Sequence, residues 1–141
     1  MSEEQNHRKR VLEAVTDRQL SSVMSNTKWR ELQDAVMETL PFPPPYQAKY
    51  VLEDRLYPAD FESDVWYWGD WMEGLLPYYN VEWIRVRPRY QKHRGNLIDP
   101  ELVDCTEDFI TILHKYNIPY QKQNDSIYIY GYISSTNILN A

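Results

Sequence analysis

Residues 81–94, VEWIRVRPRYQKHR, predict the strand around which the rest of the chain folds. The apolar side chains Ile84, Val86 and, after a proline, Tyr90 recur at every second position, which is typical of a half-buried strand. The side chains between them are expected on the opposite face: Trp83, Arg85, Arg87 and Arg89. One face of this strand therefore closes a core, while the other carries a row of guanidinium groups.

The composition indicates one domain of an ordinary globular protein. The chain has 141 residues, a length typical of a single domain. Twelve Tyr and 5 Trp outnumber 3 Phe, and such amphipathic rings favour half-buried positions and contact surfaces. No apolar run approaches the ~18 residues of a membrane helix. The polar start MSEEQNHRKR predicts no signal peptide, and with a single cysteine we expect a cytoplasmic protein.

Charge is unevenly distributed along the chain, whose net charge is -6. Residues 41–80 contain seven acidic and two basic residues, whereas residues 81–95 contain five basic residues and one acidic residue. The simplest interpretation is that the two segments neutralise each other in the folded protein. The alternative is a site for an anion or a carboxylate.

Residue periodicity and one capping pattern predict four helices and four strands. Helices are expected over 8–24, 27–40, 70–76 and 105–116, and strands over 46–53, 81–90, 118–122 and 126–132. Residues 1–7 should be frayed, residues 1–25 an N-terminal extension, helical or mobile, and residues 26–141 a single domain. The order predicts an α+β fold: a two-layer sandwich with about four strands, mostly antiparallel or mixed, and helices on one face.

Residues 54–80 lack a clear period and contain the segment DVWYWGDWMEG. Asp70 and Glu73 have the spacing of a capping box, which favours the short helix at 70–76. Trp66, Trp68 and Trp71 lie close together here. They either fold inward as a lid on the sheet or form an exposed aromatic and acidic surface for a partner.

Catalytic and metal-binding patterns are missing from the sequence. Cys105 lies on the apolar stripe of the last helix, so a buried, inert thiol is expected. His7, His93 and His114 have no second imidazole or thiol at zinc-ligand spacing. We find no glycine-rich phosphate loop and no nucleophile elbow. We therefore expect no cofactor, no metal and no catalytic residues.

The arginine row has two possible roles. Next to Tyr128, Tyr130 and Tyr132 on a neighbouring strand, it is similar to sheet faces that bind single-stranded RNA. The negative net charge and the missing RNP1 pattern argue against nucleic acid. Guanidinium groups also bind carboxylates, either on a small anionic ligand or on the protein's own Asp64 and Asp70.

Several segments together resemble a family of small bacterial proteins of unknown function: NTKWREL (26–32), PFPPPY (41–46), WGDW (68–71), VEWIRVRPR (81–89), HRGNLIDPE (93–101), DCTEDF (104–109), and NIPYQ and IYIYGY within 117–132. The resemblance covers about residues 26–132 and implies a compact domain without an established activity. At the level of fold, the small, acidic and aromatic-rich domain also resembles immunity proteins that bind toxins.

Two hypotheses follow. The first is a non-enzymatic protein-binding domain, immunity-like, that uses the acidic and aromatic residues of 60–73. The alternative is a binder of, or an enzyme acting on, a small anionic ligand held by Arg85, Arg87 and Arg89. The candidate binding residues for a ligand or partner are Arg85, Arg87, Arg89, Trp68, Asp70, Trp71 and Tyr130. The sequence leaves the oligomeric state open.

Overall fold

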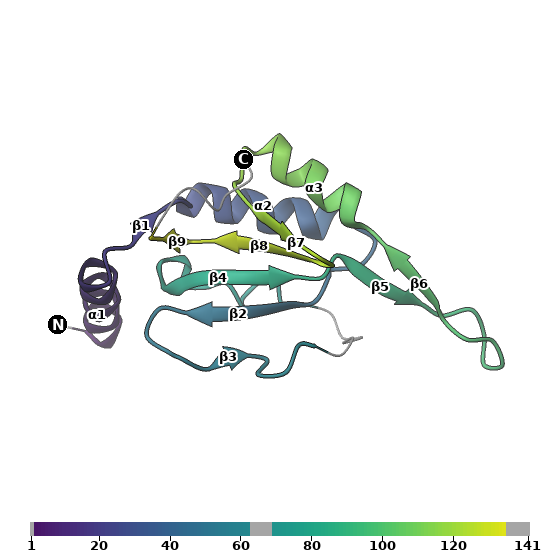
Figure 1. Cartoon of the computed structure of the whole chain (residues 1–141), viewed down its shortest axis with the longest axis horizontal. Coiled ribbons are helices and arrows are strands. Elements are labelled where there is room, and N and C mark those ends of the chain that lie inside the picture. Colours follow the sequence, from purple (N-terminus) through teal and green to yellow (C-terminus); the bar gives the residue numbers. More distant parts are fainter. Residues whose placement is uncertain (1, 63–68, 135–141) are drawn as a thin grey trace.

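The computed structural model describes residues 2–62 and 69–134 and has an α+β fold (Figure 1). A five-stranded antiparallel sheet has the order β3-β2-β4-β8-β7, and two two-stranded sheets pair β1 with β9 and β5 with β6. The predicted fold class is thus confirmed, with five strands in the main sheet instead of about four. In chain order the elements are α1 Glu3–Asp17, β1 Ser21–Ser22, α2 Asn26–Thr39, β2 Tyr46–Tyr50, β3 Leu56–Tyr57, the 3₁₀ turn η1 Tyr78–Asn80, β4 Val81–Val86, β5 Arg89–Lys92, β6 Glu101–Asp104, α3 Thr106–Lys115, β7 Gln121–Gln123, β8 Ser126–Tyr130 and β9 Tyr132–Ile133.

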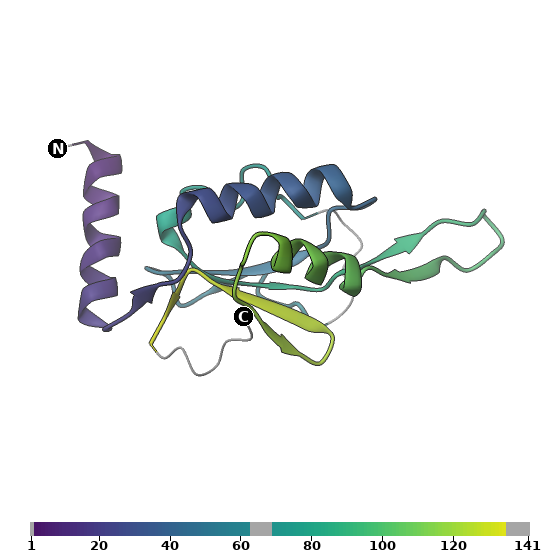
Figure 2. The same cartoon turned by 90° about the horizontal axis from the view of Figure 1, so that it is seen from above.

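The main core lies between the sheet and the helices α2 and α3, which run along one side of it (Figure 2). The central strand β4 contributes Ile84 and Val86, both fully buried, as the alternation predicts. Ala48 of β2 and Ile129 of β8 flank Ile84 in register. Burial of these aliphatic side chains on one face is what holds the helices to the sheet.

Helix α2 follows its sequence pattern closely. Trp29, Leu32 and Val36 are spaced for one helical face, and all three are buried. The N-cap is Ser25, one residue earlier than expected, because its side chain accepts a hydrogen bond from the backbone N–H of Lys28 at 3.1 Å. The helix ends just before the prolines at 41–45, which cannot continue it.

The N-terminal prediction was wrong in its boundaries. Helix α1 begins at Glu3, not near residue 8, because Ser2 and Gln5 form a capping box. Its one fully buried side chain, Val11, packs with Val51 and Tyr132. Residues 18–24 are not helical, and β1 within them pairs with β9. The first helix is therefore attached to the end of the sheet instead of being frayed.

The predicted helix at 70–76 does not form. The Asp70 carboxylate accepts a hydrogen bond from the Glu73 N–H at 3.0 Å, as a capping residue would. The chain then makes turns, with Leu76 N–H donating to the Glu73 carbonyl only three residues back. Gly74 lies tight against the Tyr46 hydroxyl, so this segment is shaped by its contacts with the sheet rather than by helix propensity.

Residues 89–104 form a β-hairpin, which we call the hairpin arm, and it projects from the body of the protein (Figures 1 and 2). The sequence predicted a strand that continues to residue 90 and no second strand before residue 118. The strand β4 instead ends at Val86, and after Pro88 the chain enters β5. Tyr90, expected in the core, stacks at the base of the arm on Phe42, with ring centroids 5.3 Å apart.

The C-terminal part has the predicted order of a helix and two strands, but the strand expected over 118–122 is β7 Gln121–Gln123, and the strand expected over 126–132 is divided into β8 and β9. Helix α3 buries Phe109, Ile112 and Leu113, and Asn117 after it has a left-handed conformation with φ of 54°. The β7–β8 hairpin turns at Asn124, between the two strands. Tyr132 is buried in β9, not on the face of Tyr128 and Tyr130, because the chain changes direction at Gly131.

The ion pairs of Glu82 lead to a test of acid stability. Arg18 donates to both carboxylate oxygens at 2.7 and 2.8 Å, and Lys49 lies 3.3 Å away. Burial alone would raise the pKa of Glu82, but the hydrogen bond from Arg18 and the charge of Lys49 outweigh it, so the pKa is lowered. Because the folded pKa is depressed, this contribution is present above the unfolded pKa, about 4.5, and is lost as the pH falls through the folded pKa.

We therefore expect Glu82→Gln to lower the free energy of unfolding by about 1 kcal/mol at pH 7 and to flatten its decline below about pH 4.5. Urea titrations between pH 3 and 7 measure both effects. Glu13→Gln removes an exposed acid from α1 and should change stability by less than about 0.5 kcal/mol. Equal acid sensitivity of wild type and Glu82→Gln would contradict the argument.

Candidate functional site

The predicted row of arginines exists and converges on one side of the sheet, forming the arginine cluster of Arg85, Arg87 and Arg89. The guanidinium carbons of Arg85 and Arg87 lie 5.4 and 5.1 Å from the centre of the buried Phe61 ring. Arg85 donates to the Ser126 hydroxyl at 2.7 Å and to the Glu62 carboxylate at 2.9 Å. Phe61 and Glu62 therefore lie against the guanidinium groups of Arg85 and Arg87.

A second carboxylate closes the cluster. Asp125 Oδ2 lies 3.5 Å from Nε of Arg87 and 3.3 Å from an Nη of Arg89. Arg87 is only 4% exposed and also donates to the backbone carbonyl of Glu62 at 3.1 Å. Glu62 belongs to the acidic segment 41–80, as the first interpretation of the charge pattern predicts, whereas Asp125 lies outside that segment.

Asp125 was missed by the sequence reasoning, which proposed Asp64 and Asp70 as partners. Asp64 lies outside the described residues, and Asp70 makes no ion pair with the arginines in the described part. The antiparallel register Val86↔Ile127 places residue 125 across from Pro88, between Arg87 and Arg89. A correct pairing of the strands β4 and β8 would therefore have identified it.

An aromatic group lies beside the arginines on the sheet face opposite the helices. Trp83 contacts Tyr128 with ring centroids 5.6 Å apart, and Tyr128 stacks on Tyr130 at 6.2 Å. Tyr130 donates from its hydroxyl to the side-chain carbonyl of Gln121 at 2.9 Å, and burial raises its pKa. All three rings are half-buried, as amphipathic aromatic residues on a partly covered sheet should be.

The other candidate residues are divided among different environments. Trp71 is 1% exposed, and its indole N–H donates to the Pro44 carbonyl at 2.8 Å, so it belongs to the core. Asp70 is exposed. Trp68 and Trp66 lie outside the described residues. The structure therefore brings Arg85, Arg87 and Arg89 together but does not join Asp70 or Trp71 to them.

An exposed surface with both apolar and acidic side chains lies where the β2–β3 turn meets the 70–76 segment. Tyr50 joins the two parts: its hydroxyl donates to the Gly74 carbonyl at 3.0 Å, and its ring lies 5.6 Å from the Tyr57 ring. We call this the acidic apolar surface. Its apolar members are 37–54% exposed, and the whole set is Leu52, Glu53, Asp54, Tyr57, Asp70, Met72, Glu73 and Leu76.

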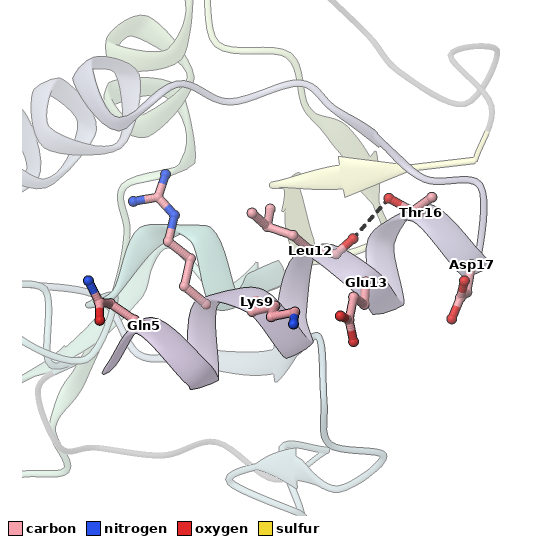
Figure 3. Close-up of a pocket in the computed structure, with 7 residues that line it drawn as sticks. Gln5, Lys9, Leu12, Glu13, Thr16 and Asp17 are labelled. Atoms are coloured by element: carbon pink, nitrogen blue, oxygen red, sulfur yellow. Dashed lines mark hydrogen bonds between the residues drawn. The ribbon is translucent and has the colours of Figure 1, made fainter. Parts of the chain in front are cut away.

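Two hollows of the described structure lie beside helices. A hollow of about 630 Å³ runs along the outer side of α1 and is lined only by that helix (Figure 3). A cleft of about 690 Å³ beside the start of α3 contains Cys105, whose pKa burial raises to about 11. Such a thiol stays protonated at neutral pH and is a poor nucleophile. The described residues contain no group of three metal-ligating side chains, and none of their helices could span a membrane.

Comparison with known proteins gives a family but no function. A protein-family model matches residues 11–136, and its description is a family of unknown function. No curated protein and no solved structure matches the chain significantly. The match confirms the resemblance to such a family and extends it into α1, whereas the resemblance noted from the sequence began at residue 26. The bacterial origin, the cytoplasmic location and the division of the chain at residue 25 stay predictions.

Proposed function

Because the chain belongs to DUF6678, a family of unknown function, we propose a function from its geometry: the domain binds another protein through the acidic apolar surface. The partner presents basic and apolar side chains. A toxin with a basic face would be one such partner, in line with the fold-level resemblance to immunity proteins. The observation that carries the proposal is the exposure of large apolar side chains within a set of carboxylates.

The apolar centre of this surface is unusual for a side facing water. Met72 and Leu76 are 54% and 52% exposed, and Leu52 and Tyr57 are 39% and 37% exposed. Single exposed apolar residues are common, but several joined through neighbouring backbone mark a contact site. Methionine is flexible and polarizable, which suits it to a protein interface.

The charges around this centre are predominantly negative. Glu53 and Asp54 directly follow Leu52, and Asp70 and Glu73 lie on either side of Met72 in the chain. Arg55, the one basic residue between Leu52 and Tyr57, lies against the Tyr57 ring at 5.5 Å. A field of one sign speeds association with an oppositely charged partner and excludes partners of like charge.

The anionic-ligand alternative is less well supported. Glu62 and Asp125 already occupy positions around the arginine cluster that a bound carboxylate or phosphate would take. An external anion would have to displace them from Arg87, which is almost fully buried. The same argument applies to a nucleic-acid phosphate, since Arg85 and Lys49 beside the aromatic rings are each paired with a carboxylate.

The experiment places a photoreactive amino acid at Met72 and, as a control, at Thr111, an exposed position on α3. Irradiation in the native cell should give an adduct from position 72 and none from position 111. Mass spectrometry identifies the captured protein, and the purified pair is then titrated. The double variant Asp54→Lys, Glu73→Lys should weaken the interaction at least about tenfold, a change of about 1.4 kcal/mol.

A charge-matched control removes the effect of net charge. The double variant Glu4→Lys, Glu13→Lys makes the same change on the exposed face of α1 and should alter Kd by less than about threefold at physiological salt. Equal weakening by both double variants, or a captured protein without a basic surface, would refute the proposal.

A further inference from the structure

The hairpin arm carries exposed apolar side chains at its tip. Leu97 is fully exposed, and Ile98 and Leu102 are 56% and 50% exposed. Every residue from Gln91 to Leu102 is exposed, and the arm stands away from the body of the domain (Figures 1 and 2). An exposed apolar tip on a projecting element is typical of a surface that contacts another molecule.

The same tip is basic on its first strand. Lys92, His93 and Arg94 are consecutive and exposed. Arg94 donates twice, at 3.0 and 2.7 Å, to the backbone carbonyl of Asp99, which is a neutral acceptor. Glu101 lies opposite Lys92 in the strand pairing, but within the described ranges no ion pair joins them. Two positive charges next to Leu97 and Ile98 are thus available to a carboxylate outside the arm.

This chemistry is the complement of the acidic apolar surface. We infer that the partner of the acidic apolar surface is the hairpin arm of a second copy of this chain. Lys92 and Arg94 of one copy face the carboxylates around Met72 of the next, and the leucine and isoleucine of the tip cover Met72 and Leu76. The inference rests on the proposed function and names the partner that the surface takes.

The topology prevents one molecule from satisfying both surfaces. Strand β4 leads toward the arm at one end of the sheet, while its antiparallel neighbour β2 ends at Tyr50, at the opposite end. In Figure 1 the β2–β3 turn lies at the end of the main sheet that is away from the arm. Contact between two different surfaces of two copies is heterologous, so association proceeds head to tail into chains or rings.

An anionic membrane is a poorer match for the arm. Asp99 and Glu101 accompany the basic residues, and the chain as a whole has a net charge of -6. A negatively charged bilayer would repel a protein of this net charge, whereas a second copy presents a local group of carboxylates around Met72.

Sedimentation velocity of the full chain tests the inference. Wild type should show a weight-average sedimentation coefficient that rises between about 10 µM and 1 mM, the Kd range of weak interfaces. The arm variant Lys92→Glu, Arg94→Glu and the surface variant Asp54→Lys, Glu73→Lys should each stay monomeric. All four positions are exposed, and circular dichroism melting verifies that each variant is folded.

The decisive sample is an equimolar mixture of the arm variant and the surface variant. In this mixture the surface variant supplies the intact arm, and the arm variant supplies the intact acidic surface. The mixture should associate again, because the intact arm meets the intact acidic surface and the reversed arm, now acidic, meets the reversed surface, now basic. If the two copies instead bound through the same patch on each, mixing the two variants would not restore association.

Other outcomes overturn the inference. A monomeric wild type, a mixture that stays monomeric, or an arm that binds vesicles of anionic phospholipid while the mixture stays monomeric would each reject it. The proposed function is judged separately: a photoadduct from Met72 with a different basic protein, weakened by the surface variant, would retain that function and reject only the second copy as partner. If neither the photoadduct nor the association of the mixture is observed, both the proposed function and the second copy as partner are rejected.

Discussion

Replacing Trp71 with alanine will lower the free energy of unfolding by about 3–5 kcal/mol. The ring is 1% exposed and packs edge-on against Tyr46 and Phe109, with centroids 5.1 and 6.1 Å away. It therefore joins the irregular 70–76 segment to both the sheet and α3. Its indole N–H also holds the Pro44 carbonyl at 2.8 Å, and truncation would leave that buried acceptor without its donor.

Two variants control for this prediction. Met72→Ala changes the neighbouring residue, which is 54% exposed, and should alter stability by less than about 0.5 kcal/mol. Trp71→Phe keeps most of the apolar volume and loses the hydrogen bond, so its cost should lie between the two. Urea unfolding monitored by circular dichroism gives all three values. An unchanged melting temperature for Trp71→Ala would show that the segment is not part of the core.

Gly131→Ala will destabilise the domain by about 2–3 kcal/mol or more. At this position β8 ends and β9 begins, and the backbone of Gly131 touches that of β4. Its N–H donates to the Glu82 carbonyl at 2.7 Å, and its carbonyl accepts from the Val23 N–H at 3.0 Å. A Cβ here would overlap the Val81 carbonyl oxygen, which is backbone and cannot rotate away.

The added methyl group should separate the β1–β9 pair from β4, so hydrogen exchange will show faster exchange at Val23 and Gly131 than elsewhere in the sheet. Gly95→Ala is the control, because Gly95 has φ of 122° but open space around it. Its cost is conformational strain alone, about 1–2 kcal/mol, without a change in exchange at β1. Unaltered exchange in Gly131→Ala would mean that the two strands do not pass as closely as described.

The parts of the fold that the sequence predicts best are those with a strong periodic pattern. Trp29, Leu32 and Val36 define α2, and Phe109, Ile112 and Leu113 define α3, because each set lies on one helical face against the core. Ile84 and Val86 likewise predict the inner face of the central strand. In these elements one face is buried, so the apolar residues recur along the sequence with the period of the helix or strand.

The parts that were mispredicted have no such pattern. The hairpin arm is exposed on both faces from Gln91 to Leu102, so its strands show no alternation to detect. Residues 70–76 carry a capping signal, yet their contacts with Tyr46 and Pro44 override it. Asp125 could be placed beside Arg87 and Arg89 only through the register of strands far apart in sequence. Tertiary contact, not local propensity, decides all three.

The shared carboxylate of Asp125 has a consequence for where the arm points. Arg87 precedes the hairpin arm and Arg89 is its first residue. The Asp125 side chain, from the β7–β8 turn, therefore binds two residues at the base of the arm. The Cys105 N–H, donating to the Pro88 carbonyl at 2.7 Å, fastens the returning strand at the same place. A small displacement of the β7–β8 turn would therefore move the tip of the arm through a much larger distance. The direction in which the arm projects thus depends on Asp125, a residue that lies far from the tip.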